Sequence, residues 1–407
     1  MVLETAIASS PQPHPVPHQL TDDGGILRLL KEHLANLRTH RRHPNRTLHY
    51  DDLLVALLVS FFEPSVRSLR TMDDASASQS HMQANISVKR LPKSTLGDAL
   101  ASMNPDALLP ILKRLMLRVP NLQRRDADLA GLQRILAIDG SFFNVPADVL
   151  WAIRQVRRNG KPAREVRLNL ALDVLEFIPA GLSLSGDDGC SEARAFIPLL
   201  RPDAVYLADR NFVDFTFLKA VLDIGSDFVV RLKSINHFAP LYAQNLDLDD
   251  RDAGVVGDTV GLVPGVKTAS GLGARHLREV VLIDPQTHKP VRLLTSLLEV
   301  PAHIIGKLYR YRWMIELFFR WLKCVARVRH AMSQTRNGIT LQFYAALIAV
   351  LATYLVTGTR PGLYEYNMLA GVMRGTSIPQ GMLEVLARRG RERELERLRK
   401  ARKKLAQ

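Results

Sequence analysis

Four polar residues recur at helical spacing near residue 316. Tyr309, Arg312, Glu316 and Lys323 are separated by three, four and seven positions, so a helix through this segment would place all four on one face. Most of the other residues of the segment are apolar and form a half that would pack on a core. One interpretation is a site that handles a charged ligand. The alternative is a solvated stripe in which Arg312 and Glu316 form an ordinary i,i+4 ion pair worth about 0.3–0.5 kcal/mol.

Two further carboxylates follow apolar runs that are typical of strands. Asp139 ends the run ILAID and precedes Gly140 and Ser141, and Asp209 ends the run VYLAD and precedes a helical pattern. Each has a structural alternative: Asp-Gly is a common hairpin turn, and an Asp after a strand often caps the next helix. These alternatives explain each residue singly, but they do not explain two strand-terminal carboxylates together with a helix-borne Glu316.

The order of elements around these residues predicts how they would meet. Apolar periodicity predicts strands at 135–146, 164–177 and 179–186, a helix at 189–200, a strand at 204–212, a helix at 214–225 and a strand at 227–234. This is the order of an α/β, ribonuclease-H-like mixed sheet. In such a sheet the first and fourth strands are neighbours, so their carboxyl ends would bring Asp139 and Asp209 to the edge where ligands bind.

The motifs resemble those of the DDE transposases of bacterial insertion sequences, in the IS-four branch. The third motif of that branch is Y-x2-R-x3-E-x6-K, and the residues from Tyr309 to Lys323 match it at every spacing. The first motif appears as Asp139-Gly140-Ser141 and the second as Asp209-Arg210-Asn211-Phe212. The segment LLTSLL and the later Ser333, Gly338 and Gln342 also look like the family. The resemblance covers roughly residues 25 to 375.

The resemblance implies a core that cuts and rejoins DNA at transposon ends, with Asp139, Asp209 and Glu316 as catalytic residues. They would hold two divalent cations, Mg²⁺ with Mn²⁺ tolerated, and such a pair about 3.5–4 Å apart can stabilise both the attacking and the leaving oxygen. Carboxylate oxygens suit these hard cations. A zinc site is disfavoured, because Cys190 and Cys324 are isolated and no His cluster has ligand spacing.

The same resemblance implies that Arg312, Lys323 and Tyr309 contact DNA phosphate near the cut, and Arg210 is a further candidate. A guanidinium can bind a phosphate through two hydrogen bonds, and an ammonium supplies a point charge. Trp313 borders the polar stripe and is a candidate for stacking on a base; the alternative is an aromatic at the edge of the core. The family's aromatic residue before the LLT segment is absent, since Val291 and Arg292 stand there.

Charge composition agrees with a DNA partner. The chain has 55 Lys and Arg against 40 Asp and Glu, a formal net charge of +15, and this basicity favours phosphate backbones. Residues 388–404 contain ten basic and three acidic residues. We interpret this run as a nonspecific DNA contact, and the alternative is a solvated helix that is partly paired with itself.

We divide the chain into five parts. These are a flexible tail at 1–25, a helical DNA-end-binding region at 26–130, a ribonuclease-H-like catalytic core at 131–234 and 301–360, a β-strand insertion at 235–300 and a basic helical C-terminal region at 361–407. In the N-terminal part, residues 91–103 have the pattern of a short helix, a turn and a helix, with a connecting helix capped by Ser94 or Thr95 as the alternative.

The apolar run 341–356 is sixteen residues long, shorter than the roughly 20 that a membrane span needs. We therefore expect a core helix behind the catalytic sheet and no membrane partner. No targeting segment is recognised, and we expect the two cysteines to be unpaired. A bacterial cytoplasmic protein associated with the nucleoid is the expected setting.

The expected partners are double-stranded DNA at terminal inverted repeats and target DNA, with a homodimer bridging two ends, as the resemblance implies. Two other functions stay open at this point. One is a metal-dependent nuclease or resolvase of the same fold that cuts without joining, and the other is a DNA-binding protein of transposase descent that no longer catalyses.

Overall fold

A computed structural model describes most of the chain, which forms two compact units: residues 1–115 with 325–407, and residues 116–324. The described residues are 26–39, 48–63, 65–86, 88–118, 127–129, 131–132, 134–156, 162–264, 272, 275–324, 331–357, 363–374, 381–382, 384–385, 388–389, 392, 395 and 399. The basic run 388–404 therefore lies outside the described residues apart from a few positions, and the N-terminal tail lies wholly outside them.

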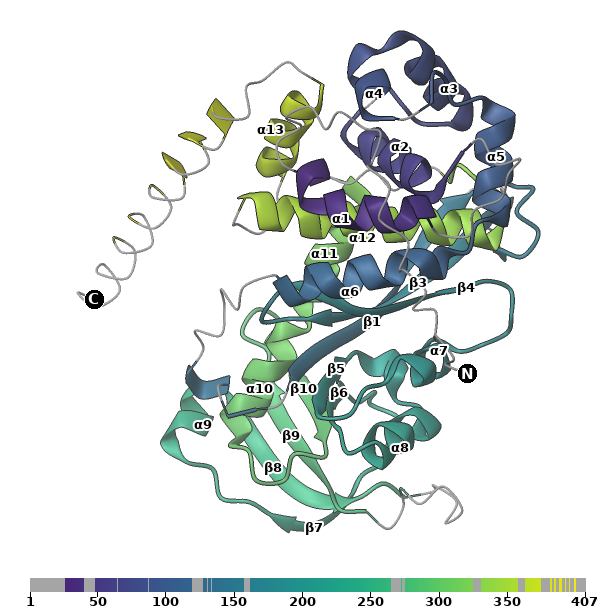
Figure 1. Ribbon diagram of the computed structural model, residues 1–407. Helices are drawn as coiled ribbons and strands as arrows, with labels where there is room; N and C mark the ends of the chain where they lie inside the picture. Colours follow the sequence, from purple (N-terminus) through teal and green to yellow (C-terminus); the bar gives the residue numbers. More distant parts are fainter. Residues whose placement is uncertain are drawn as a thin grey trace, which may run out of the picture. The chain divides into compact units, whose positions relative to one another are not determined.

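The second unit contains one large mixed sheet (Figure 1). Its strand order is β2-β3-β1-β5-β6-β10-β9-β8-β7, with β4 paired to β3. The strands are β1 (Arg134–Val145), β2 (Ile153–Val156), β3 (Pro162–Asp173), β4 (Ile178–Ser185), β5 (Ala204–Ala208), β6 (Asp227–Arg231), β7 (Ala239–Ala243), β8 (Val255–Leu262), β9 (Leu277–Ile283) and β10 (Pro290–Thr295). A mixed α/β architecture is thus confirmed.

The predicted neighbourhood of the first and fourth strands is also confirmed. β1 pairs with β5 in parallel and with β3 antiparallel, and β5 pairs with β6 in parallel. Residues of β1 and β5 alternate between the two faces of the sheet. Leu136 and Ile138 pack in one core cluster with the helices α7 (Glu192–Phe196) and α8 (Phe215–Asp223). The short 3-10 turns η3 (Ile197–Leu199) and η4 (Arg210–Phe212) complete this layer.

The other set of β1 and β5 side chains faces away from that cluster, and two consecutive helices lie against this part of the unit. These are α10 (Ala302–Tyr311), which contacts β5, β6, β8 and β9, and α11 (Trp313–Cys324), which contacts β1. The expected single helix is therefore interrupted at Arg312. The amide of Arg312 bonds to the carbonyl of Tyr309, and that of Ile315 to the carbonyl of Arg312, so the hydrogen bonds tighten to i→i+3 at the junction.

The β-rich segment after residue 234 does not form a separate sheet. β10 pairs antiparallel with β6, and β9, β8 and β7 follow it outward. The chain therefore leaves the sheet after β6, adds four strands to its edge, and returns beside β6 before entering α10. The short helix α9 (Leu248–Asp252) lies between β7 and β8.

The first unit is helical. Its helices are α1 (Ile26–Thr39), α2 (Tyr50–Phe62), α3 (Leu69–Ser78), α4 (Ser80–Asn85), α5 (Lys93–Ser102), α12 (Arg336–Thr357) and α13 (Leu363–Met373), with the 3-10 turn η1 (Pro105–Leu108) leading into α6 (Leu109–Arg118). A second short turn, η2 (Ala127–Leu129), precedes β1. Residues 93–102 form one continuous helix without a turn, and neither Ser94 nor Thr95 caps it, because its N-cap position is Pro92.

Helix α12 differs from the expectation in length and in place. It has 22 residues and is apolar enough to cross a membrane by length and composition, yet 83% of its most apolar window is buried inside the protein. It packs against α1, α2, α5, η1 and α13. It is therefore the core helix of the helical unit, whereas the sequence interpretation placed it behind the sheet.

Candidate active site

Asp139 and Asp209 lie at the same level of two neighbouring parallel strands. The register pairs Arg134 with Ala204 and continues residue by residue to Ala137 with Leu207. Two positions further along each chain stand Asp139 and Asp209, at the edge where the parallel pairing has ended. Asp139 is not a strand terminus, however, because β1 continues to Val145 against β3. The Asp-Gly pair therefore lies within a strand, and the hairpin interpretation is wrong.

Alternation along the two strands turns both carboxylates toward the same face. Ala137 and Asp139 on β1, like Leu207 and Asp209 on the β5 side, lie opposite the residues that pack on α7 and α8. One oxygen of each carboxylate accepts a local backbone bond, from the amide of Gly140 at 2.9 Å in Asp139 and from the amide of Asn211 at 2.7 Å in Asp209. Asp209 thus caps the turn η4, and its second oxygen has no hydrogen bond to that turn.

Arg312 connects the helix junction to this carboxylate edge. Its Nη2 donates to Oε1 of Glu316 at 2.6 Å, and its positive charge acts electrostatically on Asp139. The guanidinium carbon lies 5.8 Å from the ring centre of Tyr309. Burial raises the pKa of the Tyr309 phenol, so the hydroxyl keeps its proton as a donor at neutral pH. The ordinary ion pair of Arg312 with Glu316 is therefore present, and it lies beside the two aspartates.

Asp139 is the most perturbed carboxyl group at this edge. Burial, followed by the negative charges of Glu192 and Asp209, raises the pKa of Asp139 to about 7, against the opposing effects of the Gly140 amide and Arg312. The pKa of a carboxyl group is raised in this way where several acidic groups lie close together and are partly shielded from water. A bound cation would remove the repulsion, and perturbed groups of this kind cluster at functional sites.

The remaining predicted residues lie at different distances from this edge. Lys323 on α11 places its Nζ 4.9 Å from the ring centre of Phe143, which lies on β1 four residues after Asp139. Arg210 is exposed and directly follows Asp209. The side chain of Trp313, at the first position of α11, is 48% exposed.

A fourth carboxylate, Glu192, was not identified from the sequence, which placed it inside the crossover helix without a role. It is the first residue of α7, and its side chain lies directly against Gly140, next to Asp139. Burial, together with the charge of Asp209, raises the pKa of Glu192, while Arg167 and the Gly140 amide act in the opposite direction. No sequence motif around residue 192 indicates a functional role. Its significance comes from the sheet edge to which α7 returns.

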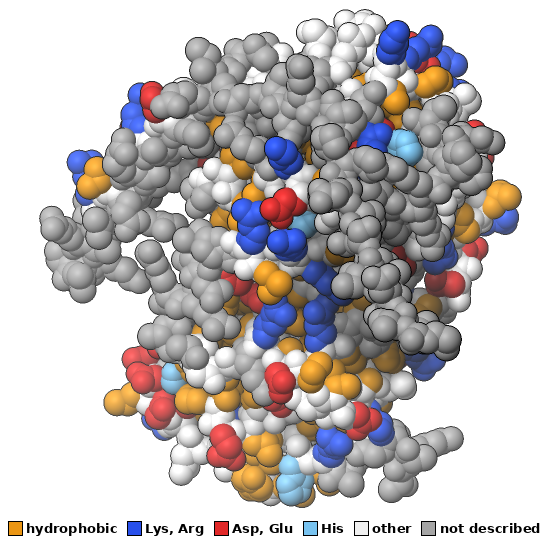
Figure 2. Space-filling model, viewed as in Figure 1, with side chains coloured by type: hydrophobic (Ala, Val, Ile, Leu, Met, Phe, Trp, Pro, Cys, Tyr) orange, Lys and Arg blue, Asp and Glu red, His pale blue; other side chains and the backbone are white. Residues whose placement is uncertain are grey.

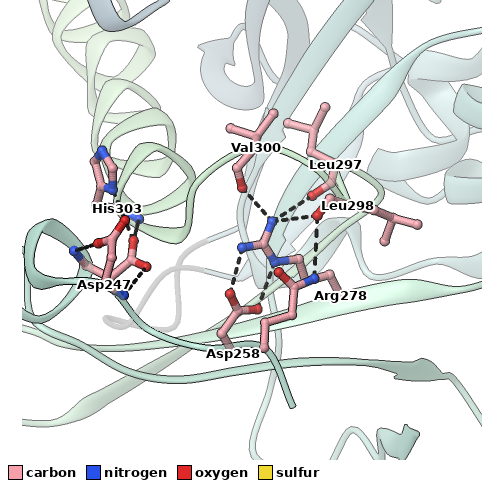
Figure 3. Close-up of polar contacts among 9 residues, drawn as sticks. Asp247, Asp258, Arg278, Leu297, Leu298, Val300 and His303 are labelled. Atoms are coloured by element: carbon pink, nitrogen blue, oxygen red, sulfur yellow. Dashed lines mark hydrogen bonds and ion pairs between the residues drawn. The ribbon is translucent and has the colours of Figure 1, made fainter. Parts of the chain in front are cut away.

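The inner strands of the β-rich segment fix the path into α10. Arg278 on β9 and Asp258 on β8 form an ion pair in which each side chain is only 2% exposed, with Nε–Oδ1 and Nη2–Oδ2 distances of 2.7 and 2.6 Å. The remaining Nη1 of Arg278 donates to the carbonyls of Leu297, Leu298 and Val300 (Figure 3). The pair therefore anchors the loop between β10 and α10, from which the Glu316 helix follows.

A second polar group holds the first turn of α10. Oδ1 of Asp250 accepts from the amide and from Nδ1 of His303, and Asp247 and Asp250 exchange the hydrogen bonds of a capping box; Asp247 and His303 are drawn in Figure 3. Oxygen and nitrogen atoms of these three residues lie within 4.8 Å of one another, a spacing that would suit a metal ion. Burial alone would raise the pKa of Asp250, but the bonds from His303 and Asp247 outweigh it and hold the pKa below its ordinary value. Helix capping explains this cluster without a cation.

The residues at the sheet edge have the ligand chemistry that divalent cations prefer, whereas ligand atoms within 4.8 Å of one another are found in the group of Asp247, Asp250 and His303. Asp139, Asp209 and Glu316 offer carboxylate oxygens only, the ligands that Mg²⁺ and Mn²⁺ prefer. Burial, and after it the charges of Glu192 and Asp209, raises the pKa of Asp139, and a bound cation would favour the ionised carboxylate. Nε of Arg312 is buried without an acceptor among the described residues, so the guanidinium keeps a donor that an anionic ligand could take after a small shift of the side chain.

Comparison with known proteins gives consistent results. The sequence profile of the family described as Transposase DDE domain matches residues 130–352. The chain is 30% identical over 148 residues to the putative transposase y4zB of Sinorhizobium fredii, which is 36% of this chain and 40% of that protein. It is 34% identical over 82 residues to the probable transposase for insertion sequence element IS5377 of Geobacillus stearothermophilus, 20% of this chain and 22% of that protein.

A putative transposase for insertion sequence element IS4SA of Synechocystis is 20% identical over 245 residues, 58% of this chain and 64% of that protein. The alignments thus span less than two thirds of the length of each of these relatives. Among solved structures, the piggyBac transposase in its synaptic complex with hairpin DNA matches 92% of this chain and 80% of that chain, with 12% identity and a TM-score of 0.42.

Proposed function

This chain belongs to the family of transposases with a DDE domain, and we propose on that basis that it cuts DNA at the ends of an insertion sequence and joins them to a target. Asp139, Asp209 and Glu316 are the proposed catalytic residues. The observation that carries the proposal is the arrangement at the sheet edge, where Asp139 and Asp209 stand level on adjacent strands and Arg312, which is bonded to Glu316, acts electrostatically on Asp139.

The three carboxylates are proposed to hold two divalent cations, Mg²⁺ in the first place and Mn²⁺ as a substitute. When bound, such cations stabilise negative charge on the attacking and leaving oxygens of a phosphodiester. The protein's own contribution is position: two carboxylates are fixed by strand register, and the third is oriented by the 2.6 Å bond from Arg312. A rigid support of this kind is what an active site with several charged groups requires.

The cationic residues on the helix side are proposed to hold the DNA backbone. Arg312 and Lys323 would contact phosphate oxygens near the scissile bond, with Tyr309 as a hydroxyl donor and Arg210 as a further contact. The half-exposed ring of Trp313 is available for stacking on an unpaired base. Arg312 would then serve two partners, Glu316 and a phosphate, which its five N–H donors permit.

The sheet supports assignment to the ribonuclease-H-like folds. β4, β3, β1, β5 and β6 lie in that spatial order; β3 is antiparallel to both of its neighbours β4 and β1, and β5 and β6 run parallel to β1. Ligands bind such sheets at the carboxyl ends of their central strands. We therefore propose that DNA is processed at the β1–β5 edge.

The parts of the chain outside the catalytic core are proposed to bind DNA. We propose that the helices of 26–130 contribute to binding of the terminal inverted repeats, that the basic run 388–404 contacts backbone phosphates, and that two protomers bridge two ends before they engage target DNA. Several groups of Lys and Arg side chains lie on the face drawn in Figure 2, in keeping with the net charge of +15. A bacterial cytoplasmic location at the nucleoid follows from this proposal.

The test is a cleavage and strand-transfer assay on the DNA that flanks this gene, with labelled duplexes carrying the terminal repeats and Mg²⁺. We expect cuts at the transposon ends and joined products with a target plasmid, both abolished by Asp139→Asn. Asp187→Asn is the control, because Asp187 is an exposed carboxylate on the loop before α7. Cutting without joining would favour a nuclease or resolvase, and end binding without any cutting would favour a protein that has lost catalysis.

A further inference from the structure

Glu192 reaches the carboxylate edge because of the direction of the strand before it. β4 is antiparallel to β3, and β3 is antiparallel to β1, so β4 runs in the same direction as β1 and β5. The chain leaving β4 at Ser185 therefore emerges at the edge where Asp139 and Asp209 lie. Glu192 begins the helix that follows, and α7 covers the opposite face of the sheet from α10 and α11.

Gly140 provides the opening through which Glu192 approaches. By alternation, a side chain at position 140 would point to the α7 face, next to Asp139 in sequence. A Cβ atom there would lie 2.2 Å from Oε1 of Glu192, closer than atoms can pack, and 3.0 Å from Cδ of Arg167, a tight contact. The carboxylate of Glu192 thus occupies the volume that any other residue at 140 would fill, immediately beside the Asp139 backbone.

Buried polar contacts hold the segment that carries Glu192. Arg167 on β3 is 8% exposed; its Nη2 donates to the carbonyl of Cys190 at 3.1 Å and its Nε to Oδ1 of Asn169 at 2.9 Å. Asn169 is fully buried, and its Nδ2 donates to Oγ of Ser185 at 2.8 Å. This chain of contacts ties the start of α7 to the two strands beneath it. The positive charge of Arg167 also acts on the Glu192 carboxylate.

We propose that Glu192 is a fourth carboxylate of the divalent-cation site, reaching past Gly140 from the face opposite Glu316. The ligand class is a hard divalent cation, since the groups that would surround it are carboxylates. This inference rests on the proposed function, because it assigns Glu192 to the same site as Asp139 and Asp209. In that arrangement the cations are held from both faces of the sheet edge, with α11 supplying Glu316 and α7 supplying Glu192.

The test measures Mn²⁺ binding directly and does not depend on DNA cleavage. Metal-stripped full-length protein is titrated with Mn²⁺ by calorimetry, and free Mn²⁺ is counted by electron paramagnetic resonance. We expect Glu192→Gln to weaken Mn²⁺ binding by about 10- to 100-fold, the range found when groups supporting a metal site are removed. Asp187→Asn, which removes one exposed carboxylate five residues earlier in the chain, should bind as the wild type does.

A second variant separates loss of the carboxylate from loss of its position. Gly140→Ala keeps Glu192 but fills its place, so it should weaken Mn²⁺ binding as well. In the double variant Gly140→Ala/Glu192→Ala the clash with the carboxylate is removed and only a 3.0 Å approach of the added methyl group to Cδ of Arg167 remains, so its Mn²⁺ affinity should be close to that of Glu192→Ala alone. Thermal unfolding of each variant confirms that the protein is folded at the temperature of the titration.

The outcomes are distinguishable. Wild-type binding that is lost in Asp139→Asn but unchanged in Glu192→Gln and Gly140→Ala overturns the role of Glu192 and leaves the proposed function intact. Absence of Mn²⁺ binding in the wild type counts against the role of Glu192 and against the cation site of the proposed function together. Weakened binding in both Glu192→Gln and Gly140→Ala, with normal binding in Asp187→Asn, supports the inference.

Discussion

Asp139 on β1 and Asp209 after β5 stand side by side because the register of two parallel strands carries them to the same level, two residues beyond the last parallel pair. Strand register is specified by the burial of a whole row of side chains, and a slip of one residue would turn every side chain to the other face. The distance between these carboxylates therefore depends on the core under the sheet. Side chains far from the site set its geometry.

The first prediction concerns the three carboxylates. Asp139→Asn, Asp209→Asn and Glu316→Gln should each reduce DNA cleavage to background and leave binding to the terminal repeats largely intact, since cation ligands are lost while the fold is kept. A gel assay in Mg²⁺ should show the protein–DNA complex without cut product. Full cleavage by any one of these variants would remove that residue from the catalytic set.

The raised pKa of Asp139 predicts how stability depends on pH in the absence of divalent cations. The pKa of this carboxyl is about 7 in the folded state and near 3.8 when unperturbed, so the folded state binds the proton more tightly. Its contribution to stability is thus fully present below about pH 4, is lost as the pH rises toward 7, and stays lost above it. The Asp139→Asn variant should not show this decrease in stability, because an amide side chain does not ionise.

The corresponding measurement is thermal unfolding of the wild type and of Asp139→Asn between pH 4 and pH 8 in a chelating buffer. The melting temperature of the variant relative to the wild type should increase across that interval and level off above pH 7. Added Mn²⁺ should stabilise the wild type and release protons on binding. A difference between the two proteins that does not change with pH would contradict the assigned shift.

Arg312 is predicted to matter more for the reaction than for the fold. Its partner Glu316 is about one third exposed, and ion pairs of that kind contribute up to about 1 kcal/mol. Loss of a group that stabilises developing charge costs roughly 100-fold or more in rate. Arg312→Ala should therefore slow cleavage strongly with a small change in melting temperature, and Lys323→Ala should behave similarly.

Arg320→Ala is the matched control, because Arg320 is an exposed arginine on α11, the helix that begins immediately after Arg312. It should cleave at nearly the wild-type rate. If Arg312→Ala instead melts many degrees lower while its folded fraction cleaves normally, Arg312 is a structural residue.

The buried pair of Arg278 and Asp258 predicts a large effect on stability. Removing one partner of such a pair leaves an uncompensated buried charge, which costs about 3–5 kcal/mol. Asp258→Ala should lower the free energy of unfolding by that amount and loosen the loop 297–300, as measured by urea unfolding and hydrogen exchange. Arg292→Gln offers the comparison, since its pair with Glu279, which joins β10 to β9, is partly exposed and should contribute less than about 1 kcal/mol. Equal effects of the two substitutions would contradict this prediction.

The basic run 388–404 predicts the salt dependence of DNA binding. Each phosphate neutralised by Lys or Arg releases counterions, so log affinity falls with log salt by about 0.9 per contact. Deleting residues 388–407 should flatten this slope by several units and weaken binding to specific and random duplexes alike, while the preference for the correct end persists. A salt titration of both proteins on both duplexes measures this. An unchanged slope would identify the run as a solvated helix, and an unchanged slope with loss of dimers would assign it to protein contacts.

Much of the central sheet was predictable, because its strands are apolar runs of distinctive length and the two aspartates follow the buried parts of two of them. The spacing of Tyr309, Arg312, Glu316 and Lys323 was equally informative, since helical periodicity survives the tight turn at Arg312. The turn itself was not predictable, because no proline or glycine marks it. Its i→i+3 bonds are a property of the junction in the folded unit.

Other features depend on contacts that no local pattern encodes. The place of α12 could not be read from its apolar composition, because a helix that is apolar on all sides can serve as the core of either unit. The pairing of β10 with β6 joins residues more than sixty positions apart. Glu192 was missed for a similar reason: its importance arises from Gly140, a residue on another strand whose missing side chain can be recognised only once the two are brought together.

The return of β10 to β6 has a consequence for evolution and for engineering. The strands added beyond β6 do not contribute equally to the path into α10: β8 and β9 hold it through Asp258 and Arg278, whereas β7 is the last strand of the sheet and exposes Leu241 and Tyr242. Insertion or deletion of residues at β7 should leave β8 and β9 in place. We expect changes of length to be tolerated at that outer border, so a reporter peptide grafted at β7 should leave the loop that leads to Glu316 undisturbed.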